Sequence, residues 1–192
     1  TAFEGLKIDA DEQFTVYLKI TDYAGHYTYI STDGYIVDMK TDGDDSLAIT
    51  EPDTGKENYT IGENQYECYR DDVTLTITAI EDAAGIQKLE YKIGKADALD
   101  SIISTPLYSY SYDAKNETNP RTEEKSENAV VKYDTYTSHP KEFQDTIVVS
   151  AKDYNYDGVT VWVKLTDLAG NETEETITLI ILDEKSEIKL SN

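Results

Sequence analysis

Two stretches of the chain decide its fold: residues 14–38, FTVYLKITDYAGHYTYISTDGYIVD, and residues 159–183, VTVWVKLTDLAGNETEETITLIILD. They align without a gap at an offset of 145, and 10 of the 25 aligned positions are identical. The identical residues of the first stretch are Thr15, Val16, Lys19, Thr21, Asp22, Ala24, Gly25, Thr28, Ile36 and Asp38. A supersecondary unit that recurs at a fixed spacing is the signature of a repeat array. The sequence therefore predicts two copies of one structural unit.

Each copy has the pattern of a β-hairpin. Val161, Val163 and Leu165 alternate with Trp162 and Lys164, which is the period-2 pattern of a strand with one buried face. The equivalent positions of the first copy alternate in the same way. An Asp-x-Ala-Gly turn follows in both copies, and it places an aspartate where it can accept backbone N–H bonds and a glycine where φ is positive. The structural role is the preferred interpretation of these aspartates.

Further alternating segments lie between the two copies. Residues 73–79 and 89–93 read as strands joined by a turn at 81–85, whereas no sustained helical period is capped at both ends. Other strand candidates are 47–50, 106–112 and 145–151. About seven short strands are what a sandwich needs. The residues expected to face its core are Val73, Leu75, Ile77, Leu89, Tyr91, Ile93, Val161, Val163 and Leu165.

Residues 72–94, DVTLTITAIEDAAGIQKLEYKIG, together with the second copy, resemble the bacterial immunoglobulin-like repeats of very long surface and adhesin proteins. The resemblance lies in the Gly-Ile turn, the Glu-Tyr-x-Ile strand and the Asp-x-Ala-Gly-Asn hairpin, although His26 stands where the family usually has Asn. It covers residues 47–184 as a full copy and 3–38 as the last strands of a preceding one. It implies an all-β, immunoglobulin-like antiparallel β-sandwich in a tandem-repeat stalk that spaces or presents an adhesive tip, and it implies no catalysis.

The expected domain organisation follows from the repeat. Residues 1–38 form the C-terminal part of one repeat, and 39–46 form an acidic linker. Residues 47–184 form a complete domain with a long insertion at about 100–141, and 185–192 form a tail or a linker to a further repeat. A half sandwich cannot bury its apolar face alone. We therefore expect another chain, another fragment or a neighbouring molecule to complete the first copy.

The charge balance limits the partners. The chain has 39 acidic and 17 basic side chains, a net charge of -22, so nucleic acid and anionic bilayers are repelled. Cys68 is the only cysteine, which excludes an intramolecular disulfide. No run of about 18 apolar residues is present, so we expect no membrane insertion by this segment. The expected location is extracellular, either secreted or attached to a cell surface.

Catalytic residue sets are poorly represented, and we expect that the protein is not an enzyme. His26 and His139 are the only histidines, one in a hairpin turn and one before a proline, and no nucleophile elbow of the Gly-x-Ser-x-Gly type occurs. One cysteine and two histidines do not make a usual zinc site.

Calcium is the one cofactor that the sequence suggests. Asp153, Asn155 and Asp157 alternate and are followed by Gly158, as in the opening of a calcium loop. Position 12 of such a loop would be Lys164 instead of a bidentate glutamate. A solvated turn without metal is the alternative interpretation.

A second group of candidate calcium ligands lies in the linker: Asp42, Asp44 and Asp45. In a sandwich, the incoming strand starts at the end that carries the loops of Glu81, Asp82 and Asp167. So many carboxylates at one joint repel unless a hard cation neutralises them. A flexible, solvated linker is the alternative.

The insertion carries a third candidate site. Tyr108, Tyr110 and Tyr112 are spaced by two and share one face of a strand, where an exposed row could stack on sugar rings or on a protein. The alternative is that these tyrosines pack on the sandwich and that 113–130 is a loop. Three hypotheses follow: a structural spacer or adhesin stalk module, a carbohydrate- or protein-binding module, and an accessory domain of a secreted glycan-active enzyme. The expected partners are neighbouring immunoglobulin-like repeats and a host or matrix protein or glycan.

Overall fold

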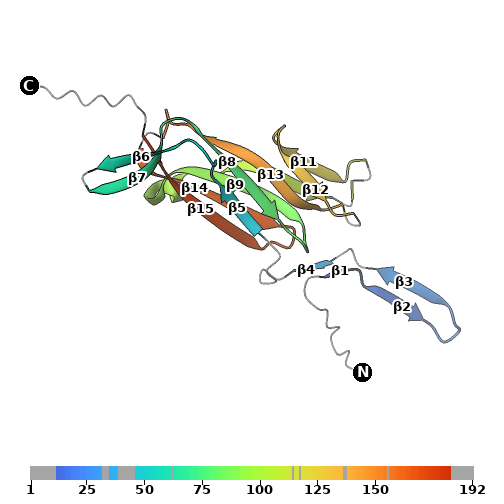
Figure 1. The fold of residues 1–192 in the computed structure, drawn as a ribbon. Coiled ribbons are helices and arrows are strands. Elements are labelled where there is room, and N and C mark those ends of the chain that lie inside the picture. Colours follow the sequence, from blue (N-terminus) through green and yellow to red (C-terminus); the bar gives the residue numbers. More distant parts are fainter. Residues whose placement is uncertain are drawn as a thin grey trace, which may run out of the picture.

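The computed structural model describes residues 12–31, 35–38, 46–61, 63–113, 115–116, 118–135, 138–154 and 156–182. Within this part of the chain the protein is all-β, with a single short 3-10 helix, η1 (Ala96–Ser101) (Figure 1). The all-β prediction is therefore confirmed.

Two sheets face each other and form a β-sandwich-like body. The larger sheet has the order β11-β10-β9-β14-β15-β7-β6 and the smaller one the order β12-β13-β8-β5. The strands of the larger sheet are β6 (Lys56–Ile61), β7 (Asn64–Tyr69), β9 (Ile86–Lys95), β10 (Thr105–Tyr112), β11 (Arg121–Lys125), β14 (Tyr156–Asp167) and β15 (Glu172–Ile181). Those of the smaller sheet are β5 (Ser46–Thr50), β8 (Val73–Ile80), β12 (Val130–Tyr133) and β13 (Pro140–Val149).

One strand pair departs from the expected antiparallel arrangement. β15 and β7 run parallel and meet at the pair Ile181↔Tyr69, where Leu182 N also donates to Tyr69 O at 2.9 Å. The larger sheet is therefore mixed, because the hairpin β6–β7 joins it beside the end of β15.

The core lies between the two sheets. In β8, buried residues alternate strictly with more exposed ones, as the period-2 pattern predicts. Of the nine expected core residues, all but Tyr91 and Ile93 are buried, and these two are partly buried against the same core cluster. The inward phase predicted for β8, β9 and β14 is confirmed.

The insertion is more ordered than a loop. β11 pairs antiparallel with β10, and β12 pairs with β13, so residues 121–125 and 130–133 extend both sheets. Every residue of β11 is exposed and most are charged, which leaves no apolar alternation from which a strand could be predicted. Pairing with β10 therefore holds β11 in the sheet, because its side chains bury no apolar surface.

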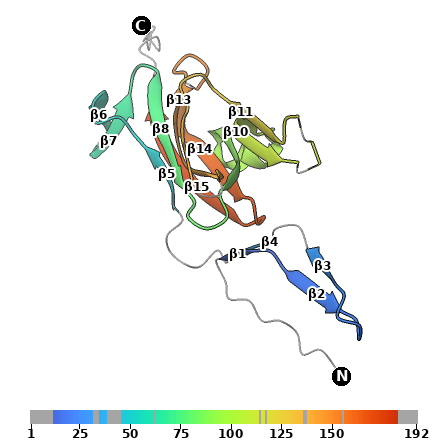
Figure 2. The same ribbon diagram turned by 90° about the vertical axis from the view of Figure 1, so that its right-hand side faces the viewer.

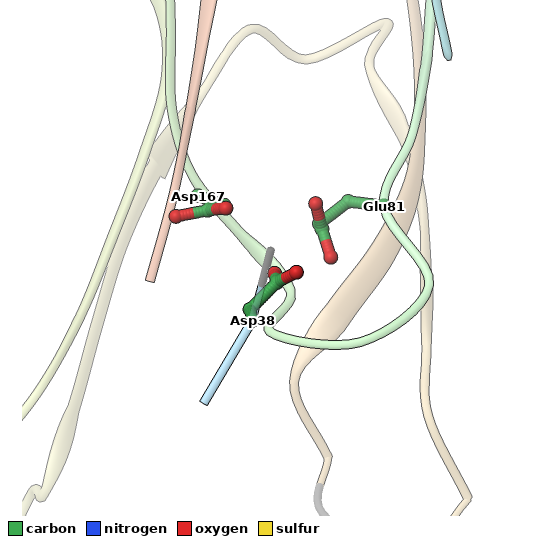
Figure 3. A group of neighbouring side chains, drawn as sticks. All are labelled: Asp38, Glu81 and Asp167. Atoms are coloured by element: carbon green, nitrogen blue, oxygen red, sulfur yellow. The ribbon is translucent and has the colours of Figure 1, made fainter. Parts of the chain in front are cut away.

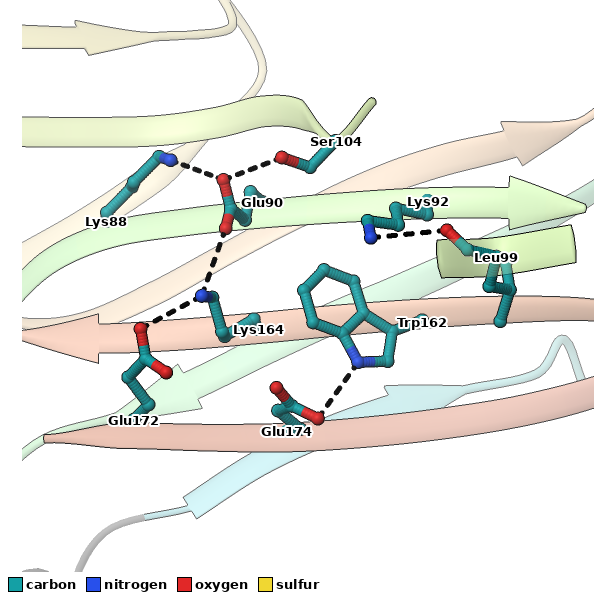
Figure 4. A network of polar contacts seen from close by, with 9 residues as sticks. All are labelled: Lys88, Glu90, Lys92, Leu99, Ser104, Trp162, Lys164, Glu172 and Glu174. Carbon is teal, nitrogen blue, oxygen red and sulfur yellow. Dashed lines mark hydrogen bonds and ion pairs between the residues drawn. The ribbon is translucent and has the colours of Figure 1, made fainter. Parts of the chain in front are cut away.

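The outer face of β9, β14 and β15 carries a network of polar contacts (Figure 4). Lys164 Nζ lies 2.9 Å from Glu172 Oε1 and 3.5 Å from Glu90 Oε1. Glu90 also accepts hydrogen bonds from Lys88 and, at 2.8 Å, from Ser104 Oγ. This outward orientation of Lys164 confirms the predicted phase of β14.

The first copy folds as a separate hairpin. β2 (Tyr17–Thr21) pairs with β3 (Tyr27–Ser31), and β1 (Glu12–Phe14) pairs with β4 (Tyr35–Val37). The pair Tyr17↔Ser31 in β2–β3 is equivalent to Trp162↔Thr176 in β14–β15, so the two copies share one register. The β2–β3 hairpin projects away from the two sheets, whereas β1 and β4 lie beside one end of them (Figures 1 and 2).

Candidate metal centre

The turn of the second copy is built around Asp167. Asn171 donates from its backbone N to Asp167 Oδ1 and from its side-chain Nδ2 to Asp167 Oδ2, each at 2.8 Å. Gly170 has φ +93°, which only glycine adopts without strain. The expected structural role of the aspartate and the glycine is confirmed at this turn.

The turn of the first copy uses the same device. Asp22 Oδ1 accepts hydrogen bonds from the backbone N of Ala24 and of His26, both at 2.9 Å. His26 Nδ1 lies 3.0 Å from Asp22 Oδ2, and this side-chain bond is the main cause that lowers the pKa of Asp22. His26 thus contacts the aspartate carboxylate of this turn with its backbone N and its side chain, as Asn171 does in the second copy.

A second acidic turn faces that of Asp167. Glu81 follows β8, and its Oε1 accepts hydrogen bonds from the backbone N of Ala83 at 3.0 Å and of Ala84 at 2.9 Å. Leu168 N donates to Gly85 O at 2.9 Å and ties the two turns together. Their carboxylates are therefore held at one end of the sandwich.

Asp38, which follows β4, completes a group that we call the carboxylate triad: Asp38, Glu81 and Asp167. Their ligand oxygens all lie within 4.8 Å of one another (Figure 3). Asn171 Nδ2 donates to the backbone O of Asp38 at 3.3 Å, a contact between the two copies. The triad thus lies at the joint where the first copy meets the second.

The chemistry of the triad fits a hard divalent cation. Glu81 is 1% exposed and Asp167 3% exposed, and Asp38 is partly buried. Carboxylates this close repel each other strongly where water is scarce. The triad offers only oxygen ligands, which Ca²⁺ and Mg²⁺ prefer, whereas structural Zn²⁺ sites use Cys and His. Carbonyls or water can complete a coordination of six to eight.

The predicted joint is found in part. The loops of Glu81 and Asp167 do meet the incoming chain, but Asp42, Asp44 and Asp45 lie outside the described residues. Asp82, beside Glu81, points outward with its side chain 61% exposed and lies 3.9 Å from Lys141 Nζ.

Asp38 was not predicted as a ligand from the sequence. Asp38 is one of the ten positions identical between the copies, so a signal was present. It could not be read as a metal site because the partners of Asp38 come from turns more than forty residues further along the chain.

The 153–158 segment differs from a calcium loop. Asp153 is exposed, and Asn155 lies outside the described residues. β14 begins at Tyr156, so Asp157 pairs with Ile180 in the ladder, and its side chain is not among those described. Gly158, with φ +77°, lies at the bulge of that ladder and not at the tight turn that a calcium loop needs.

The tyrosine row is not exposed as a whole. Tyr108 is 1% exposed and Tyr110 4%, whereas Tyr112 is 55% exposed. The Tyr108 ring packs on Phe143 with centroids 5.4 Å apart, and its hydroxyl donates to Glu123 Oε1 at 3.0 Å. An exposed platform of three tyrosines was therefore a wrong expectation, because β10 turns this face toward β13.

The two histidines lie far from each other in the sequence and serve different neighbours. His26 belongs to the exposed turn described above, and His139 packs edge-on against the Tyr110 ring, where burial lowers its pKa.

A groove of about 480 Å³ between β10 and β13 contains buried Asp145. Its carboxylate accepts hydrogen bonds from Ser126 Oγ at 2.6 Å and Thr146 N at 2.7 Å, which is a structural use.

Comparison with protein-family models and with curated proteins finds no match for this chain. Within the described residues, no helix is long and apolar enough to cross a membrane. The functional assignment therefore depends on the repeat, the fold and the carboxylate triad.

Proposed function

We propose that the protein is a non-enzymatic structural and adhesion module, a spacer or stalk repeat of a secreted or cell-surface bacterial protein. One observation carries this proposal: the end of the first copy meets the turns of the second copy at Asp38, Glu81 and Asp167. A spacer transmits length only when successive units are joined in a fixed orientation. Two of the three residues, Asp38 and Asp167, stand at positions that are identical between the two copies, which suits that task.

The proposal includes an immunoglobulin-like type for the unit. It is supported by two facing sheets, by one hydrophobic core between them and by the hairpin that recurs with an identical register. Stacked units of one kind are natural neighbours in such an array. The proposed partners are therefore further units of the same repeat.

Calcium is the proposed ligand of the joint. Extracellular calcium modules bind at about 10⁻⁴ to 10⁻³ M, which matches the millimolar calcium outside cells. Millimolar calcium is about one- to tenfold above such a Kd, so a cation that binds only the assembled triad stabilises the folded chain by about 0.4–1.4 kcal/mol. For a chain of this size, that free energy corresponds to a rise in the melting midpoint of about 1–6 °C.

The test is a melting experiment in EDTA, in millimolar Mg²⁺ and in millimolar Ca²⁺ with the wild type, Asp38→Asn and Asp82→Asn. Asp82 is the matched control, since it belongs to the same turn as Glu81 but points outward. We expect Ca²⁺ to raise the midpoint of the wild type and of Asp82→Asn, and Asp38→Asn to lose most of that rise.

Two results would contradict the calcium proposal. One is an unchanged midpoint in the wild type, and the other is an equal calcium response in Asp38→Asn and the wild type. If Asp38→Asn is more stable than the wild type in every buffer and none of the three responds to Ca²⁺, the three carboxylates repel each other and no cation offsets the repulsion.

The binding-module alternative has weaker support. Of the tyrosine row, only Tyr112 is exposed, and a single ring is a small platform for a sugar or a protein. An accessory domain of a glycan-active enzyme would need the same platform.

A further inference from the structure

The first copy exposes the face that the second copy buries. Leu18 and Ile20 are 49% and 47% exposed, whereas their equivalents Val163 and Leu165 are 0% and 2% exposed. Ile30, which pairs with Leu18, is exposed on the same face. Apolar residues alternate regularly along this strand and so share one face, which suits contact with another sheet.

The second copy shows what kind of element covers such a face. β9 pairs along the edge of β14, with Val161 opposite Ile93 and Leu165 opposite Leu89. β8, which the turn at 81–85 connects to β9, lies in the facing sheet, and its inward residues belong to the same core cluster as those of β14. By contrast, within the described residues β2 is paired with β3 and with no other strand.

The charged residues on the outer face indicate which kind of strand would pair with the edge of β2. Lys164 is opposite Glu90 in the β14–β9 ladder, and Trp162 is opposite Lys92, whose Nζ lies 4.9 Å from the indole centroid. Lys19 and Tyr17 hold the equivalent positions on β2. A strand with the order Glu-x-Lys would therefore meet Lys19 with its acid and Tyr17 with its lysine.

We propose that the edge and inner face of β2 form a docking surface for two connected strands of the β8–β9 type, supplied by a further unit of the same repeat. The Glu-bearing strand would pair along the edge of β2, and the alternating Val/Leu/Ile strand would pack on its inner face from a facing sheet. The inference depends on the repeat-array part of the proposed function and not on calcium.

The experiment uses the full chain and, as the probe, a synthetic peptide of residues 71–96, which contains β8, the turn and β9. Binding is measured by fluorescence anisotropy in EDTA, and hydrogen exchange identifies the protected amides. We expect saturable binding with new protection in β2. Leu18→Asp should weaken it by about tenfold or more, since a buried charge would replace an apolar contact.

Matched variants separate docking from unfolding. Tyr23→Ser changes a fully exposed residue of the turn, outside the edge and inner face of β2, and should retain most of the binding. A Glu90→Lys peptide should bind more weakly because its lysine would oppose Lys19. A third variant, Ile30→Asp, changes the inner face on β3 and should act as Leu18→Asp does.

Three outcomes would overturn the inference: no saturable binding, protection confined to β14 and β15, or equal binding by Leu18→Asp and wild type. Sedimentation that reveals a dimer of the full chain, lost in Leu18→Asp, would also overturn it. The face would then be covered by a second copy, whose β8 and β9 are already paired within its own sandwich. None of these outcomes depends on whether Ca²⁺ binds the triad, so the two proposals fail separately.

Discussion

The two hairpins of this protein, β2–β3 and β14–β15, have the same turn and the same register but opposite environments. Both turns are closed by an aspartate that accepts backbone N–H bonds and by a glycine with φ near +90°. Yet every residue of β2 and β3 is exposed, whereas the inward residues of β14 are buried. Local sequence thus determines the hairpin, and the elements packed on it determine its burial.

The outer faces differ in how the same lysine is used. In β14, Lys164 forms ion pairs with Glu172 and Glu90. In β2, the equivalent Lys19 lies 4.5 Å from the centroid of the Tyr27 ring, and Tyr27 is equivalent to Glu172. One position therefore supports an ion pair in one copy and a cation–π contact in the other, and only the former is embedded in a larger sheet.

The largest expected effect comes from truncating equivalent apolar residues. Leu165→Ala should lower the free energy of unfolding by about 2–5 kcal/mol, because it leaves a cavity in the core. Ile20→Ala should change it by less than about 0.5 kcal/mol, as is usual for exposed positions. Urea denaturation followed by the fluorescence of Trp162, the chain's only tryptophan, measures both. Equal costs would show that the hairpins do not differ in burial.

A smaller effect is expected in the outer network of the larger sheet. Burial acts to raise the pKa of Glu90, but the hydrogen bonds from Lys88 and Ser104 outweigh it and leave the pKa below its ordinary value of 4.5. Glu90→Gln should lower the free energy of unfolding by about 1.5–3 kcal/mol near neutral pH, the usual size for hydrogen bonds to a charged group.

The pH dependence of that cost has a definite sign. A depressed pKa means that the carboxylate stabilises the folded state fully above pH 4.5 and loses this contribution as pH falls through the lower folded value. The difference between wild type and Glu90→Gln should therefore shrink below about pH 4. A stability difference between wild type and Glu90→Gln that stays constant or grows on acidification would contradict a stabilising role for the Glu90 carboxylate.

The smallest expected effect compares the two lysines. Lys164→Met should destabilise the sandwich by about 0.5–1 kcal/mol, since it removes two ion pairs on a partly exposed face. Lys19→Met should change sandwich stability by less than about 0.5 kcal/mol, because its partner is a ring on the projecting hairpin. Parallel denaturant titrations give both values, and a larger cost at Lys19 would reverse the comparison.

The sequence predicts best where local pattern and burial agree. The strands around Leu75, Leu89 and Val163 were predicted because apolar residues alternate there and the structure buries them. β6, β7 and β11 were not, since exposed or charged strands have no such alternation and depend on their neighbours. The burial of Tyr108 was one of two interpretations, because spacing by two fixes a shared face but not which face points inward.

The sequence predicted where the candidate site lies but not all of the residues that form it. The joint was expected to gather Glu81 and Asp167 with acidic residues of the linker. The third member is instead Asp38, whose backbone O accepts a hydrogen bond from Asn171, 133 positions further along the chain. Such a contact depends on how one unit docks on the next, and no periodicity within a single unit encodes it.

The most direct test of the account is a crystal structure of the chain grown in millimolar CaCl₂. We expect one cation at the joint, bonded to oxygens of Asp38, Glu81 and Asp167 at about 2.3–2.6 Å, with the first copy held against the second. A structure in which Ca²⁺ is absent from the triad, or in which Asp38 lies away from Glu81 and Asp167, would contradict the account.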